Sequence, residues 1–80
     1  MIVNKDITTQ YNTFNKNIKY YRKKLGFTQE DLAEKSGLSI SYIKQIESKR
    51  EYSNVTFITL SKLSMALNVT IRELFTEITK

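Results

Sequence analysis

Apolar residues recur every three to four positions along most of this chain, and polar residues fill the positions between them. This period is that of amphipathic helices with one buried side, so it predicts an all-α fold. We expect five helices, which cover about 13–25, 29–36, 40–48, 57–67 and a last stretch after Thr70. The apolar positions that we expect to be buried are Phe14, Ile18, Tyr21, Leu25, Leu32, Ala33, Leu38, Ile43, Ile46, Phe57, Leu60, Leu63, Leu67 and Leu74.

Local signals mark where several of these helices start and stop. Thr28 precedes Asp31 by three positions, and Thr70 precedes Glu73 in the same way, so each pair predicts a capping box at a helix start. The chain has two glycines and no proline, and both glycines stand where a helix should end.

The stretch 28–48 contains two short predicted helices joined by a turn at Gly37. We expect this glycine to adopt the left-handed conformation, and Ser39 to cap the second helix. Two short helices around a tight turn are typical of a DNA-binding helix-turn-helix, whose second helix enters the major groove. The apolar positions of the second helix point at the core, which leaves on its other faces Ser39, Ile40, Ser41, Lys44 and Gln45.

The first dozen residues are harder to assign, because Ile2, Val3, Ile7 and Tyr11 are apolar among polar neighbours. Three alternatives remain for 1–12: an arm that packs on the domain, an early part of the first helix, or a segment that meets a partner chain. We therefore divide the chain into this segment and a helix-turn-helix domain over 13–80.

Composition argues against an enzyme. Eighty residues form one small domain, and the chain has neither cysteine nor histidine, so thiolate metal sites and the commonest general base are excluded. No apolar run approaches the roughly 20 residues of a membrane span. We expect a cytoplasmic protein that binds no cofactor, metal, membrane or small-molecule ligand.

The net charge of +5 is confined to one part of the chain. Residues 14–50 hold nine basic and four acidic side chains, whereas the two kinds balance in the remainder. A localised basic face suits a polyanion such as DNA.

From the first predicted helix to Phe75, the chain resembles the lambda-repressor-like (Cro/Xre-type) helix-turn-helix family. The stretches that carry the resemblance are IKYYR at 18–22, GFTQEDLA at 26–33, GLSISYI at 37–43, IE at 46–47 and ALNVTIRELF at 66–75. The resemblance implies a compact five-helix domain and a transcriptional regulator that binds double-stranded DNA sequence-specifically.

The resemblance also implies a role for individual residues. Base contacts are expected from Ser39, Ile40, Ser41, Lys44 and Gln45, and phosphate contacts from Gln29, Tyr42, Lys49, Arg50 and Lys23. Gln29 is also expected to brace the recognition helix, and Tyr42 has the alternative of covering the junction of the second and third helices. Ile40 is a residue type that ordinarily belongs to a core.

Two further expectations come from the family pattern. Arg22 and Glu47 should form an inward ion pair between the first helix and the end of the recognition helix. The segment 48–56 lacks the glycine and proline that most members have there, so the path of this loop is not carried over.

Such domains read two half-sites as symmetric dimers, so we expect a homodimer on a palindromic operator. The expected contact residues are Phe75, Ile78 and Ile71, on an apolar stripe of the last helix; alternatively, the whole stripe folds onto the first and fourth helices.

Small members of the family resemble phage repressors, controller proteins of restriction–modification systems, and antitoxins, and the first two fit this length best. A protein-interaction module that uses the basic face and 1–12 is the alternative from another class.

Overall fold

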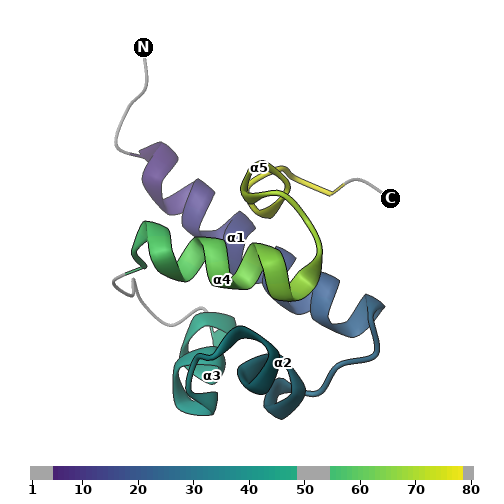
Figure 1. The fold of residues 1–80 in the computed structure, drawn as a ribbon. Helices are drawn as coiled ribbons and strands as arrows, with labels where there is room; N and C mark the ends of the chain where they lie inside the picture. The colour runs from purple at the N-terminus through teal and green to yellow at the C-terminus, as the bar shows by residue number, and fades with distance from the viewer. Residues whose placement is uncertain (1–4, 49–54, 79–80) are drawn as a thin grey trace.

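A computed structural model of the 80-residue chain describes residues 5–48 and 55–78, and all regular structure in these ranges is helical (Figure 1). The five helices are α1 (Lys5–Lys24), α2 (Gln29–Ser36), α3 (Ile40–Ser48), α4 (Phe57–Leu67) and α5 (Ile71–Leu74). The all-α prediction is confirmed, and α2, α3 and α4 begin and end where the sequence predicts. No described helix is long and apolar enough to cross a membrane.

The first helix is longer at its start than predicted, because it begins at Lys5 rather than near Thr13. Residues 5–12 are therefore its opening turns, and residues 1–4 lie outside the described part. At the other end, Leu25 is exposed, so its assignment to the buried stripe is wrong. The chain already turns there, since Gly26 has a φ of +77° and the Phe27 N–H bonds to the Arg22 carbonyl.

The caps that bound the helix-turn-helix form as the sequence predicts. The Thr28 hydroxyl accepts the Asp31 N–H at 2.9 Å, and the Asp31 carboxylate accepts the Thr28 N–H at 2.9 Å. This backbone donor keeps the pKa of Asp31 below its ordinary value. Gly37 is left-handed with a φ of +77°, and the Ser39 hydroxyl accepts the Tyr42 N–H at 3.1 Å. These local bonds fix the lengths of α2 and the turn into α3.

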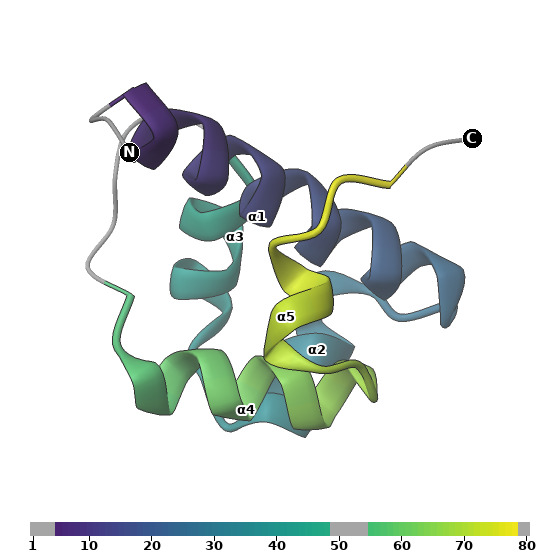
Figure 2. The same cartoon turned by 90° about the horizontal axis from the view of Figure 1, so that it is seen from above.

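The helix-turn-helix forms one end of the molecule, and the other helices cover it (Figure 1). Viewed from above, α1 and α4 run along opposite sides, with α5 between them (Figure 2). The core draws on all five helices, and its fully buried apolar side chains are Phe14, Ile18, Leu32, Ile43, Ile46, Leu63, Leu67 and Leu74. Tyr21, Ala33, Leu38 and Leu60, which were expected inside, are partly buried against this core.

Two expectations about the C-terminal half are wrong. Phe57 was assigned to the inner side of α4, yet it is exposed; Thr59, which was not predicted, is buried together with the predicted Leu63 and Leu67. The last helix ends at Leu74, so Phe75 and Ile78 do not continue a helical stripe. The Phe75 ring stacks on the buried Phe14 ring, with 5.3 Å between centroids, while it stays partly exposed.

Candidate nucleic-acid interface

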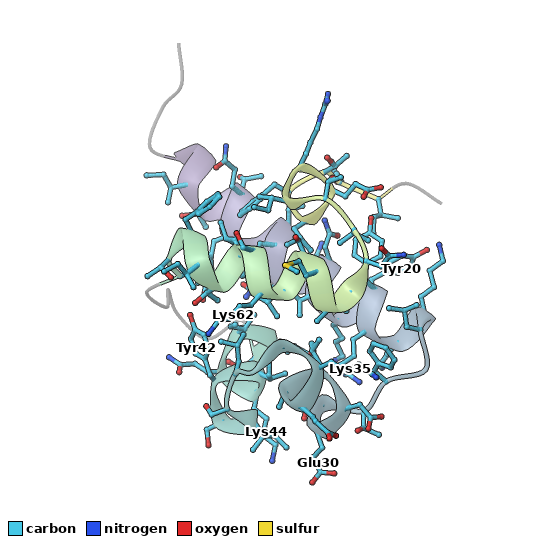
Figure 3. The ribbon with its side chains drawn as sticks, viewed as in Figure 1. Tyr20, Glu30, Lys35, Tyr42, Lys44 and Lys62 are labelled. Atoms are coloured by element: carbon cyan, nitrogen blue, oxygen red, sulfur yellow. The ribbon has the colours of Figure 1, made fainter. Side chains whose placement is uncertain are left out.

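The polar side of α3 faces solvent, while Ile43 and Ile46 on its other side are fully buried. Of the five predicted base-reading residues, Ser39, Ser41, Lys44 and Gln45 are exposed, and Ile40 is half-buried. Figure 3 shows Lys44 pointing away from the body of the protein at the end formed by α2 and α3. The geometry that a recognition helix needs is therefore present: one side is held by the core and the other is free to enter a groove.

A surface hollow brings together residues from the start of α2 and the outward side of α3. It is lined by Thr28, Gln29, Glu30, Ile40 and Lys44. The partial positive charge of a helix N-terminus and the ammonium of Lys44 both favour an anion at this place. Ile40 borders this hollow and lies outside the buried core.

Glu30 was not predicted as a site residue. Its carboxylate lines the same hollow as Lys44, and both side chains lie at the same end of the molecule (Figure 3). A carboxylate at a base edge accepts a hydrogen bond from the cytosine amino group and repels phosphate. The signal in the sequence is ambiguous, because an acidic residue in the first turn of a helix also favours the helix dipole.

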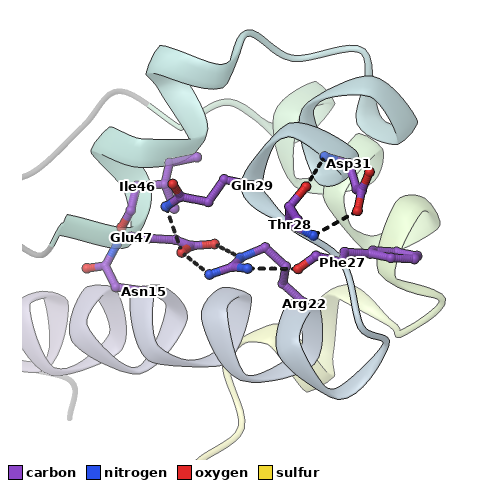
Figure 4. Close-up of polar contacts among 8 residues, drawn as sticks. All are labelled: Asn15, Arg22, Phe27, Thr28, Gln29, Asp31, Ile46 and Glu47. Atoms are coloured by element: carbon purple, nitrogen blue, oxygen red, sulfur yellow. Dashed lines mark hydrogen bonds and ion pairs between the residues drawn. The ribbon is translucent and has the colours of Figure 1, made fainter.

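Arg22 and Glu47 form an ion pair that joins α1 to the end of α3 (Figure 4). Arg22 Nε donates to one carboxylate oxygen at 2.7 Å, and a terminal guanidinium nitrogen donates to the other at 3.0 Å. The remaining terminal nitrogen donates to the Phe27 carbonyl at 2.8 Å. The side chains are 9% and 3% exposed, so both charges are largely removed from water and depend on each other.

Gln29 connects the start of α2 to the same carboxylate. Its Nε2 donates to a Glu47 oxygen at 3.1 Å (Figure 4). This hydrogen bond supports the predicted role of Gln29 in bracing α3. A side-chain amide carries two N–H donors, so the second remains for a phosphate, and that contact stays a prediction.

Of the other residues predicted to contact phosphates, Tyr42 and Lys23 lie within the described part of the chain. Tyr42 is half-buried and packs against the core, which agrees with its alternative role at the helix junction. Lys23 is exposed in the last turn of α1. Lys49 and Arg50, and most of the loop over 48–56, lie outside the described residues. Within the described ranges, no group of three or more acidic side chains is placed to hold a metal ion.

Comparison with known proteins identifies the class. A family described as helix-turn-helix matches residues 18–74, so the chain belongs to the helix-turn-helix family. The lambda-repressor-like resemblance is confirmed.

Two relatives of known name are similar to this chain over 60 residues. Over 60 residues the chain is 43% identical to the control protein C.SmaI of Serratia marcescens, covering 75% of this chain and 69% of that protein. It is 38% identical over 60 residues to the transcriptional regulator SinR of Bacillus licheniformis, covering 75% of this chain but 53% of SinR. The chain thus spans about half the length of SinR.

Two solved structures share the fold. The restriction–modification controller protein C.AhdI of Aeromonas hydrophila superposes with a TM-score of 0.74 at 34% identity, covering 84% of this chain and 98% of that one. The hypothetical transcription factor NHTF of Neisseria superposes with a TM-score of 0.77 at 28% identity, covering 85% and 76%.

Proposed function

We propose that this protein is a sequence-specific transcriptional regulator that binds a palindromic operator in duplex DNA as a homodimer. The observation that carries the proposal is the exposed polar side of α3, with Ser41, Lys44 and Gln45, on a helix whose opposite side is anchored in the core. In this role the protein acts in the cytoplasm by occupying an operator, where it blocks or recruits RNA polymerase. The likeness to C.SmaI and C.AhdI supports a controller-type regulator.

The five proposed base-reading residues at and after the start of α3 suit different base edges. Gln45 can pair bidentately with adenine, and Lys44 can reach guanine O6 and N7 or a phosphate. Ile40 can pack on a thymine methyl. Ser41 can reach a base or a phosphate, whereas the Ser39 hydroxyl already accepts the Tyr42 N–H and keeps its proton and one further lone pair for other partners.

Phosphate contacts would fix the position of α3 in the groove without reading sequence. The N-terminus of α2 with Gln29, together with Tyr42 and Lys23, supplies this set among the described residues. We propose that Lys49 and Arg50 contact phosphates as well.

We place the contact between subunits on α4 and α5. The outward side of α4 carries three strongly exposed apolar side chains: Phe57 at 72%, Ile58 at 65% and Met65 at 80%. Ile58 and Met65 are seven positions apart and so share one side of the helix. A second copy presents the same apolar side, which makes an isologous contact self-complementary. Ile71, Phe75 and Ile78 remain proposed contacts, although Phe75 already uses part of its ring on Phe14.

Salt dependence separates this function from a protein-interaction module. If a dimer neutralises six or more phosphates, affinity for duplex DNA should fall by about a thousandfold or more between roughly 50 and 200 mM salt. Fluorescence anisotropy with a labelled duplex measures this slope. No affinity for any duplex at low salt, together with tight binding to a protein partner, would favour the interaction module instead.

Gln45→Ala should reduce discrimination between the preferred duplex and a random one by about 1–3 kcal/mol, because a bidentate base contact is lost. Lys23→Ala is the control, since loss of a phosphate contact weakens both duplexes alike. Equilibrium titration of both duplexes provides the comparison. An equal loss on both duplexes for Gln45→Ala would show that Gln45 does not read a base.

A further inference from the structure

Two asparagines on α1 are buried, although neither belongs to the apolar pattern that predicts the core. Asn15 is 1% exposed and Asn17 is 3% exposed. Each donates its side-chain amide to backbone carbonyls at the end of another helix. The last carbonyls of a helix lack intrahelical partners, and burying them unpaired is unfavourable, so such donors decide where the helix end lies.

Asn15 serves the recognition helix. Its Nδ2 donates to the Ile46 carbonyl in the last turn of α3 (Figure 4). The next residue along α3 is Glu47, which is held by Arg22 and Gln29. Asn15 and Arg22 are seven positions apart, so they lie on the same side of α1 and hold adjacent residues of α3. The C-terminal end of α3 is thus fixed by a backbone contact from Asn15 and a side-chain contact from Arg22.

The orientation of α3 depends on this end. The start of α3 lies six residues, or about 9 Å, from Ile46, so a tilt of about 10° at Ile46 displaces the first residues of the helix by roughly 1.6 Å. Hydrogen bonds to base edges are lost over such a distance, because donor and acceptor must stay within about 3.2 Å. Long lysine side chains that contact phosphates follow the change far more easily, because their charge acts at longer range.

We propose that Asn15 is a positioning residue for sequence readout: its amide holds the end of α3 so that the exposed side chains meet base edges. This inference rests on the proposed function. It assigns Asn15 an effect on the preference between DNA sequences that is larger than its effect on binding to DNA in general.

Asn17 provides a matched control in the same helix. Its Nδ2 donates to the carbonyls of Leu74 at 3.0 Å, Thr76 at 2.8 Å and Glu73 at 3.3 Å. It therefore caps α5 as Asn15 caps α3. The two residues share type, helix and burial, but only Asn15 contacts the recognition helix.

The experiment compares Asn15→Ala with Asn17→Ala in the full chain. Melting is followed by circular dichroism, and affinity for the preferred and a random duplex is measured at a temperature where both variants are folded. We expect both variants to melt earlier. Asn15→Ala should reduce the ratio of specific to random affinity by about tenfold, the effect of one lost base contact, while Asn17→Ala should leave the ratio unchanged.

Asn15→Leu distinguishes the loss of the hydrogen-bond donor from the loss of side-chain volume, because leucine has a similar volume and no donor. It should keep more of the stability than Asn15→Ala and lose the same discrimination. A folded Asn15 variant with the wild-type ratio would overturn the inference, as would an equal loss of ratio in Asn17→Ala. A wild-type protein that prefers no duplex sequence would overturn the proposed function itself, and this inference with it.

Discussion

Replacing Glu47 by alanine should lower the free energy of unfolding by about 3–5 kcal/mol, because Arg22 is left buried without its counter-charge. The Arg22 side chain is 9% exposed, and Gln29 also loses its acceptor in this variant. Urea unfolding at neutral pH measures the change. The protein that stays folded should still bind DNA, because Glu47 faces away from the exposed side of α3 and Asn15 still holds the end of that helix through the Ile46 carbonyl.

Two further variants test whether the loss of stability comes from the buried ion pair. Glu34→Ala removes an exposed glutamate of α2 and should change stability by less than about 0.5 kcal/mol. A double variant, Arg22→Met with Glu47→Leu, replaces the pair by apolar side chains and should recover much of the loss. Unchanged melting of Glu47→Ala together with abolished DNA binding would contradict the structural role that we assign to the pair.

Placing a charge on the outward side of α4 should prevent formation of the proposed homodimer. In Ile58→Glu, a carboxylate would have to be buried against its own copy, so we expect a monomer. Because Ile58 is 65% exposed in one chain, the fold itself should not be affected. Affinity for a two-half-site duplex should fall by about 10²–10⁴, since each half-site is then bound independently.

Sedimentation of the protein measures its oligomeric state, and titration of duplexes with one and two half-sites measures its affinity for each. A single half-site should bind wild type and Ile58→Glu equally. Leu25→Glu is the control, because Leu25 is exposed at the far end of α1, outside the proposed surface. Wild-type protein that is monomeric and binds two half-sites without cooperation would argue against the dimer.

The parts of the fold that were predicted from the sequence are those fixed by neighbouring residues. Thr28, Gly37 and Ser39 set the ends of α2 and the start of α3 through bonds that span three or four positions. The start of α1 was left open, because only Ile7 and Tyr11 are apolar among residues 5–12, and Ile7 is exposed within the helix. A helix without a clear apolar side is not visible to a periodicity argument.

The parts that were missed depend on distant residues. The end of α5 coincides with carbonyls held by Asn17, which is more than fifty positions away in the chain. The contact of Asn15 with Ile46 joins residues 31 positions apart. Phe57 has the spacing of a core residue, and only the packing of α4 decides that it points outward. The Arg22–Glu47 pair was expected from the family pattern, since no local signal links its two charges.

Selection of bound duplexes from a random pool tests the central claim most directly, which is that the exposed side of α3 reads base edges. The wild-type chain should enrich an inverted repeat whose half-sites lie about one helical turn apart. Gln45→Ala should enrich the same repeat with one position in each half-site no longer specified. Enrichment of no sequence by the wild type, or of an identical motif by both proteins, would contradict the account.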